Sequence, residues 1–229
     1  KKVSEIKDLW IDVGSKDKKQ TESLVDIGDP LVIDYGFDDL SNDIVVGRAF
    51  DNRSGAFVVL EAARQLSKLK TSVKVHAVAT SQEEIGLRGA QTSSYEANPD
   101  FAIAVDVTFA TDHPQMGDVI KRENIITLGG GPVLSRGPNM NPKLFELIVK
   151  TAKENKIPLQ INAEPRGTGT DANAIQLCRS SVPTCLVSIP LRYMHSPCEL
   201  VHLKDIENCS KLISKTVQKV TLKTDFRPF

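Results

Sequence analysis

The chain has 229 residues, of which 40% are hydrophobic and 25% are charged. This balance is typical of a folded globular protein and excludes a disordered chain, a collagen and a disulfide-rich scaffold. The 29 basic residues cancel the 29 acidic ones, so the chain has no net positive charge to attract a polyanion. We therefore expect small partners, and neither nucleic acid nor a membrane surface.

Apolar runs and cysteine spacing bear on the compartment. No uninterrupted apolar run approaches the ~20 residues that span a bilayer, and the start of the sequence lacks a secretory hydrophobic segment. The four cysteines do not have the paired short spacing of a structural zinc site. Scattered thiols are typical of a reducing compartment, so we predict a cytoplasmic protein.

The first 42 residues differ in pattern from the rest of the chain. Short apolar groups at 9–11 and 31–33 are separated by turns that contain glycine and proline, which predicts short strands of a small β unit. From residue 43 onward, strand and helix patterns alternate. The predicted strands cover residues 44–50, 73–80, 101–107, 125–128, 157–162 and 184–189. The predicted helices cover residues 52–69, 87–95, 171–179 and 204–220, with one more starting at Asn141 and Pro142.

This alternation predicts an α/β domain over residues 43–229, with a largely parallel sheet sandwiched by helices. In such sheets, ligands bind beyond the carboxyl ends of the strands. The sequence places acidic or imidazole side chains after four of the predicted strands: Asp51, the pair Glu83 and Glu84, Asp106, and His195.

Oxygen ligands with an imidazole and no thiolate suit a hydrolytic zinc, cobalt or manganese centre. In a dinuclear site, one carboxylate bridges the two ions and another stays free to take a proton from water. Neighbouring side chains of an extended segment point apart, so Glu83 and Glu84 could divide these roles. Each residue alone also has an ordinary explanation as a helix cap, an exposed charge or a loop residue, so the hypothesis depends on their coming together at one sheet edge.

Five motifs carry a family resemblance: GRAFDNR at 47–53, SQEEIGLRGA at 81–90, VDVT at 105–108, GTGTDA at 167–172 and IPLRYMHSP at 189–197. In this order they resemble the glutamyl and deblocking aminopeptidases, the tetrahedral family of dinuclear metallo-aminopeptidases, some of which are labelled endoglucanases. The resemblance extends from about residue 7 to about residue 220. It implies a metal-dependent aminopeptidase that removes N-terminal residues from peptides.

The resemblance also implies a role for each site residue. It makes Glu83 the general base and Asp51 the carboxylate that bridges two divalent ions, most commonly zinc or cobalt, with manganese as a further candidate. The remaining implied ligands are Glu84 and His195 for one ion and Asp106 for the other. In the loop that precedes a predicted helix, Gly169, Thr170 and Asp171 are candidate substrate-binding residues.

The family further implies a homo-oligomer, with dimers assembling into a dodecamer, and makes residues 1–42 part of a β-rich dimerisation domain. The sequence departs from the family pattern in one respect. In the family, the second ion is bound by a further histidine from an upstream His-x-Asp segment. In this chain, all four histidines follow Asp51. This departure leaves open an inactive or truncated homologue that serves as an assembly subunit. The endoglucanase labels and the paired carboxylates leave open a glycoside hydrolase as a second alternative.

Overall fold

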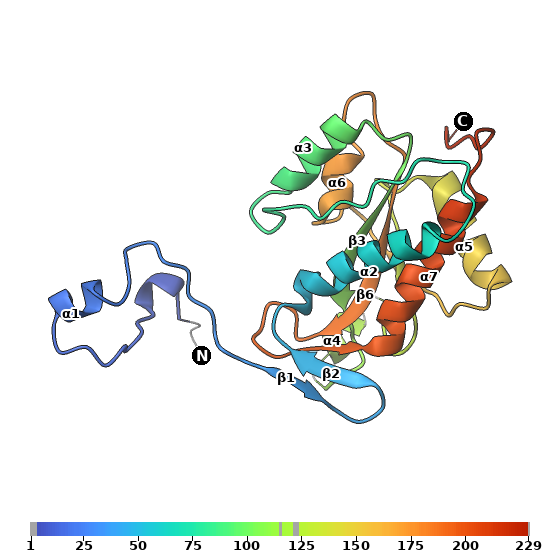
Figure 1. Ribbon diagram of the computed structural model, residues 1–229. Coiled ribbons are helices and arrows are strands. Elements are labelled where there is room, and N and C mark those ends of the chain that lie inside the picture. Colours follow the sequence, from blue (N-terminus) through green and yellow to red (C-terminus); the bar gives the residue numbers. More distant parts are fainter. Residues whose placement is uncertain (1–3, 115, 121–123, 229) are drawn as a thin grey trace. The chain divides into compact units, whose positions relative to one another are not determined.

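Figure 1 presents a computed structural model of the chain, which describes residues 4–114, 116–120 and 124–228. The chain divides into two compact units, residues 1–34 and residues 35–229, and each is described by itself. Among the described residues, no helix combines the length and the apolar character needed to cross a membrane.

The smaller unit contains a 3-10 helix, Ile6–Asp8, and the short helix α1, Lys18–Glu22. The predicted strands at 9–11 and 31–33 are absent, and no side chain in residues 4–34 is buried. An apolar group forms a strand only where another strand pairs with it, and residues 4–34 supply none to one another. The larger unit begins at Tyr35, before the predicted boundary at residue 43, because β1 pairs with β2 inside it.

The larger unit contains seven strands among its described residues. They are β1 Phe37–Asp39, β2 Ile44–Gly47, β3 Ala102–Phe109, β4 Val133–Arg136, β5 Gln160–Ala163, β6 Thr184–Arg192 and β7 Glu199–His202. Its helices are α2 Phe50–Leu66, α3 Arg88–Ala97, α4 Gly117–Ile120, α5 Pro142–Glu154, α6 Asp171–Ile175 and α7 Leu203–Lys219. One sheet with helices packed against it confirms the predicted α/β class.

The sheet is mixed, and the prediction of a largely parallel sheet was wrong. Strand order is β1-β2-β7-β6-β4-β5. Strand β3 lies outside this order and pairs with β6 from Thr184 to Leu191, whereas β4 and β7 pair with shorter parts of β6. Among the described strands, β3–β6 and β4–β5 are the parallel pairs, and the other pairings are antiparallel. Only residues 193–198 join β6 to β7, fewer than the dozen or so that a parallel crossover needs. That short connection forces an antiparallel return.

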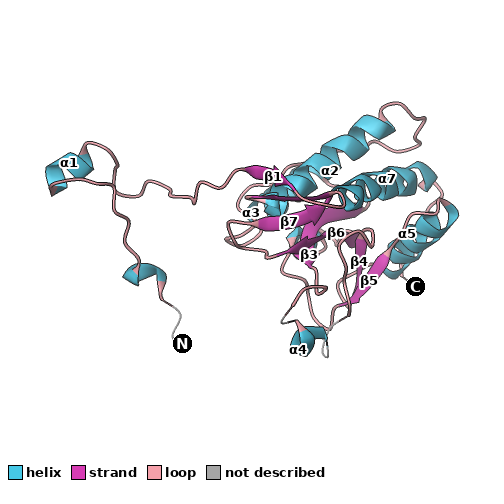
Figure 2. Cartoon of the chain, turned by 90° about the horizontal axis from the view of Figure 1, so that it is seen from below, coloured by secondary structure: helices cyan, strands magenta, loops and turns pink. Residues whose placement is uncertain are grey.

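Helices α2 and α7 lie side by side on the sheet, and α5 packs against α7 (Figures 1 and 2). Val58 of α2 and Leu212 of α7 are fully buried in the core that these elements form with β6. Strand β6 is buried from Thr184 to Leu191. The core thus fixes the ends of α2 and β6, from which the candidate site residues extend.

In the larger unit, two predicted strands are absent. Residues 73–80 form none, because no described strand pairs with them. This segment and β3 both line a cavity of about 1190 Å³. Residues 125–128 form no strand either. This segment is hydrogen-bonded to Thr111, whose hydroxyl accepts the Ile126 N–H at 2.9 Å. Conversely, the sequence did not predict β1, β4 and β7.

Candidate functional site

Asp51 lies where β2 gives way to α2. The backbone turns through Ala49 in the left-handed region (φ 58°), and Asp51 itself has a non-helical ψ of 105° within the first turn of the helix. The predicted strand 44–50 therefore ends early, at Gly47, and Asp51 lies in the first turn of α2 instead of at the end of the strand. Its side chain is buried at the edge of the sheet where His195 also lies.

The acidic pair occupies a tight turn before α3. The backbone N–H groups of Gly86 and Leu87 donate to the Glu83 carbonyl at 3.0 and 2.9 Å, and the Gly89 N–H donates to the Ser81 carbonyl at 2.8 Å. Gly86 takes a φ of 121°, which favours glycine. These bonds close the turn, so the two glutamates are carried by a defined backbone conformation.

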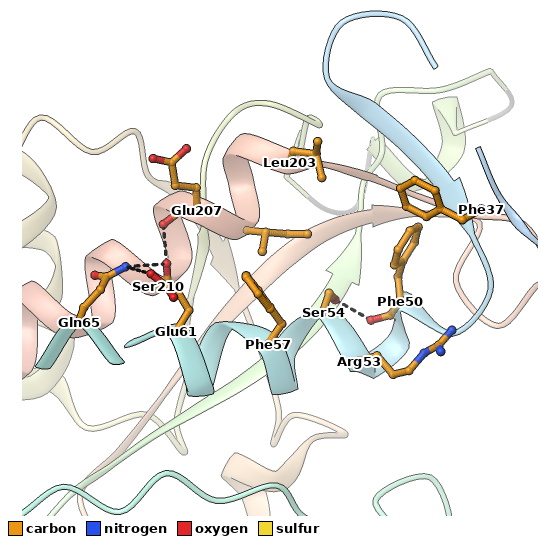
Figure 3. Close-up of a pocket in the computed structure, with 11 residues that line it drawn as sticks. Phe37, Phe50, Arg53, Ser54, Phe57, Glu61, Gln65, Leu203, Glu207 and Ser210 are labelled. Atoms are coloured by element: carbon orange, nitrogen blue, oxygen red, sulfur yellow. Dashed lines mark hydrogen bonds between the residues drawn. The ribbon is translucent and has the colours of Figure 1, made fainter. Parts of the chain in front are cut away.

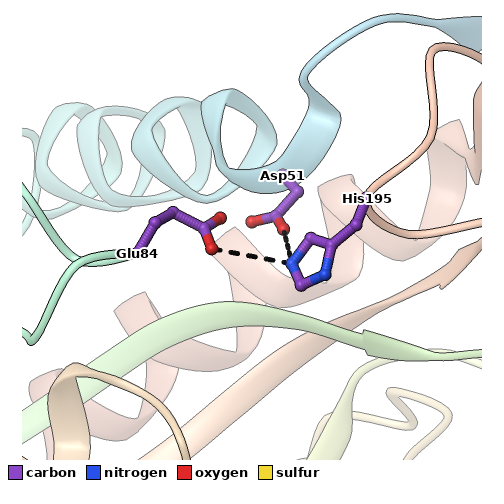
Figure 4. A group of neighbouring side chains, drawn as sticks. All are labelled: Asp51, Glu84 and His195. Carbon is purple, nitrogen blue, oxygen red and sulfur yellow. Dashed lines mark ion pairs between the residues drawn. The ribbon is translucent and has the colours of Figure 1, made fainter. Parts of the chain in front are cut away.

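His195 belongs to the connection between β6 and β7 and has a φ of 61°. Its Nε2 lies 3.1 Å from Asp51 Oδ2 and 3.6 Å from Glu84 Oε2, as Figure 4 shows. One ligand atom from each of the three residues lies within 4.8 Å of the other two. We call Asp51, Glu84 and His195 the three-ligand group. Three segments far apart in the sequence meet in it.

Asp106, in β3, is buried beside this group but does not belong to it. Its Oδ1 accepts the Val107 N–H at 2.8 Å and the Asn52 side-chain amide at 3.1 Å. Asn52 also donates to the Val105 carbonyl at 3.0 Å. The residue that follows Asp51 thus ties the start of α2 to the strand that carries Asp106.

The carboxylates of this region have raised pKa values. Burial, followed by repulsion from Glu84, raises the pKa of Asp51 to about 6, although His195 opposes the shift. Burial, with Glu84 and Asp171 as further causes, raises the pKa of Glu83 to about 7. Burial also raises the pKa of Asp106 to about 7, against the stabilising Val107 N–H. Close, partly desolvated acids favour a bound cation.

The donor set fits a divalent cation. Two carboxylates and one imidazole are the ligands of hydrolytic zinc and related ions, which keep a coordination position open for water or substrate. The Glu84 and His195 side chains are more than half exposed, so a ligand can reach them from solvent. The described residues therefore provide one cluster with the chemistry of a metal site.

The three candidate substrate-binding residues lie at the start of α6. Thr170 is the residue before the helix, and Gly169 has open space around it. Asp171 accepts the Thr80 hydroxyl at 2.6 Å, and its other carboxylate oxygen is buried without a hydrogen bond. The Asp171 charge also raises the pKa of Glu83. This loop therefore lies in the electrostatic neighbourhood of Glu83.

A second hollow, of about 700 Å³, lies between α2 and α7 (Figure 3). Its lining is largely apolar, with Phe50, Phe57 and Leu203 among its side chains, and Ser210 accepts a hydrogen bond from Gln65 at 3.3 Å. None of the predicted site residues lines it. The candidate chemistry therefore stays with the three-ligand group and the neighbouring acids.

The sequence interpretation missed Glu199. This residue begins β7 and is 2% exposed. Its carboxylate accepts the Asp51 N–H at 3.0 Å and the His195 N–H at 3.2 Å. A charged residue four positions after His195, at the start of an apolar segment, was the signal that could have identified it.

The chain is similar to known proteins over most of its length. Residues 1–212 match the profile of the M42 glutamyl aminopeptidases. The chain is 39% identical to the lysyl aminopeptidase of Pyrococcus furiosus, covering 96% of this chain and 62% of that protein. It thus spans about three fifths of that relative's length.

Solved structures give the same result. The TET aminopeptidase of a marine-sediment Thaumarchaeota archaeon superposes with a TM-score of 0.90 at 36% identity, over 97% of this chain and 63% of that one. PhTET1-12s, a dodecamer in its crystal, superposes with a TM-score of 0.76 at 30% identity, over 91% of this chain and 61% of that one. These matches agree with the resemblance carried by the five motifs.

Proposed function

The chain belongs to the M42 glutamyl aminopeptidase family, and on that premise we propose that it is a metal-dependent aminopeptidase acting on the free amino terminus of peptides. The observation that carries the proposal is the convergence of Asp51, Glu84 and His195 within 4.8 Å of one another. Metal-dependent hydrolysis requires an ion that keeps one coordination position open to water or substrate. Two carboxylates and an imidazole suit such an ion, and the Glu84 and His195 side chains are open to solvent.

In this proposal the three-ligand group would hold one divalent ion, and Asp51 and Asp106 would contribute ligands to a second. Zinc or cobalt suits these ligands, and manganese is a further candidate. Bound there, such ions act as Lewis acids toward the scissile carbonyl and lower the pKa of water. Asn52 keeps the Asp106 carboxylate oriented through its side-chain amide.

Glu83 is the proposed general base. Burial and neighbouring acids raise the pKa of Glu83 to about 7, and a group with a pKa near the working pH accepts and returns a proton efficiently. Glu83 would take the proton of the attacking water and deliver it to the leaving amine. Gly169, Thr170 and Asp171, near this base, are proposed to contact the substrate.

We also propose a cytoplasmic homo-oligomer in which dimers assemble into a dodecamer, the number of subunits found in PhTET1-12s. Two features support this proposal. The cysteines are all free, as expected in a reducing compartment, and residues 4–34 bury none of their side chains. Dimer contacts through residues 1–42 would cover apolar side chains of that segment.

Hydrolysis of amino-acid anilides tests the function. The protein with added cobalt or zinc should release the amine from substrates with a free amino group, and excess chelator should abolish the release. Chelator-insensitive cleavage of glycosides instead would favour the glycoside hydrolase. A folded protein that cleaves no anilide would favour the inactive assembly subunit.

Glu83→Gln tests the proposed base. The substitution removes the proton acceptor but keeps the shape of the side chain, so turnover should fall by about 100- to 10,000-fold while metal content stays the same. Glu96→Gln, at an exposed glutamate of α3, is the matched control and should keep full turnover. Near-normal turnover in the Glu83 variant would exclude its role as the base.

A further inference from the structure

Glu199 connects two parts of the candidate site without belonging to the three-ligand group. One carboxylate oxygen accepts the backbone N–H of Asp51 at 3.0 Å, and the other accepts the backbone N–H of His195 at 3.2 Å. The residue is 2% exposed. A buried carboxylate is costly unless it is hydrogen-bonded, and here both of its oxygens have partners within the site.

Both of these N–H groups belong to irregular backbone. Asp51 has a non-helical ψ of 105° within α2, and His195 has a φ of 61°. A left-handed conformation costs a non-glycine residue free energy and persists only where its surroundings hold it. Two hydrogen bonds to an ionised group are among the stronger ones available for this purpose.

The position of Glu199 in the sheet explains how it reaches both segments. In the β2–β7 pair, Glu199 lies opposite Gly47, the last residue of β2. From there, one segment leads forward to Asp51, and the connection from β6 arrives through His195. A single side chain at this position therefore contacts both segments where they diverge from the sheet.

We infer that Glu199 is a positioning residue, which holds the Asp51 and His195 backbones at the separation that their side chains need to bind one divalent cation. The inference rests on the proposed function for the identity of the ligand. Glu199 is not one of the three ligands, and it acts through the two residues whose backbone N–H groups its carboxylate accepts.

Glu199→Gln separates this role from ordinary structural support. The amide keeps one acceptor oxygen but places an NH2 donor against the other backbone N–H. Asp205→Asn is the matched control, because Asp205 is also fully buried and accepts two backbone N–H groups, those of Gly129 and Gly131, at 2.7 and 2.8 Å. Both variants lose the same kind of interaction, but only Glu199 binds the ligand residues.

Calorimetric titration of the metal-free proteins with zinc or cobalt alone measures the effect. The Glu199 variant should bind the ion at least tenfold more weakly than the unmodified protein, about 1.4 kcal/mol, while the Asp205 variant keeps its affinity. Equal affinity in the Glu199 variant and the unmodified protein would overturn the inference. An equal loss in both variants would also overturn it, because burial alone would then explain the result.

Amide hydrogen exchange, measured by mass spectrometry, tests the hydrogen bonds without metal or activity. In the unmodified protein, the Asp51 and His195 amides should exchange at least tenfold more slowly than unprotected amides. Fast exchange at both positions overturns the inference, whether or not the protein binds metal or cleaves peptides. This measurement also decides the matter if the Glu199 variant does not fold, and it keeps a failed positioning role distinct from a failed function.

Discussion

The acids of the candidate site oppose one another when no cation is present. Burial and mutual repulsion raise the pKa of Asp51 to about 6 and those of Glu83 and Asp106 to about 7. Each raised pKa reflects an ionised form that the folded protein disfavours relative to water. The same negative charges attract a divalent ion. The ionised carboxylates therefore destabilise the metal-free fold and increase its affinity for metal.

The stability of the metal-free protein should fall as the pH rises. In the unfolded chain these carboxyls titrate near pH 4, so between about pH 4 and pH 7 the folded state binds more protons than the unfolded state. Stability from these groups is therefore present at low pH and lost as the pH passes through their folded pKa values. Glu61 and Asp225, whose neighbouring arginines lower their pKa values to about 2, stay ionised across this range.

Urea unfolding in excess chelator, compared at about pH 5.5 and about pH 8, measures this effect. The free energy of unfolding should be greater at the lower pH. Saturating zinc should reverse the order, because the ion binds the ionised ligands of the folded state. A metal-free protein that is more stable at the higher pH would contradict the raised pKa values.

Asp106→Asn isolates one of these charges. Both hydrogen bonds reach Asp106 Oδ1, and an asparagine oxygen can accept them equally. Removing the buried charge should stabilise the metal-free protein at about pH 8 by about 1–3 kcal/mol, since one pKa unit is worth about 1.4 kcal/mol, and should weaken metal binding. Asp100→Asn, at an exposed carboxylate, should change neither quantity. An Asp106 variant that is less stable than the unmodified protein would contradict this account.

At the scale of elements, the turn that carries Glu83 and Glu84 depends on a close approach at Gly89. A Cβ atom there would lie 2.4 Å from the Ser81 nitrogen and 2.5 Å from its carbonyl oxygen, so any side chain must displace the start of the turn. The first residues of α3 therefore fix the backbone two residues before Glu83.

Gly89→Ala tests this dependence. We expect at least a tenfold loss of metal affinity, because the displaced turn carries Glu84 away from His195. Gly36→Ala is the control, since nothing lies within 4 Å of the corresponding Cβ position and no positive φ is required there. Unchanged zinc titration in the Gly89 variant would show that the turn tolerates displacement.

The α/β class and the meeting of Asp51, Glu84 and His195 could be predicted from the sequence, although the strand predicted before Glu84 is absent and β4 and β7 were not predicted. Distances could not be predicted in this way, since they depend on irregular backbone at Ala49 and His195. Glu199 escaped prediction because its role comes from strand pairing between segments far apart in the chain. The pattern at 73–80 failed for a related reason, because alternation predicts a strand without supplying its partner.

At the scale of the whole molecule, residues 4–34 present apolar side chains that they do not bury themselves. The most exposed of these side chains are Ile6, Leu9, Trp10, Ile11, Leu24, Ile27, Leu31, Val32 and Ile33. Soluble proteins seldom expose so dense a set unless another surface covers it. In the proposed assembly, a second copy of the chain would bury these apolar side chains.

Trp10 is the single tryptophan of the chain and is 81% exposed, so its fluorescence reports this cover directly. In the assembled protein, acrylamide should quench Trp10 much less than free tryptophan, and dilution to monomers should remove the difference. Ile27→Ser should shift sedimentation toward monomers, because it removes an exposed apolar side chain of the same segment. Leu222→Ser changes an equally exposed side chain of the larger unit and should leave sedimentation unchanged. If the protein sediments as a monomer at every concentration, with Trp10 quenched like free tryptophan, these residues do not mediate assembly.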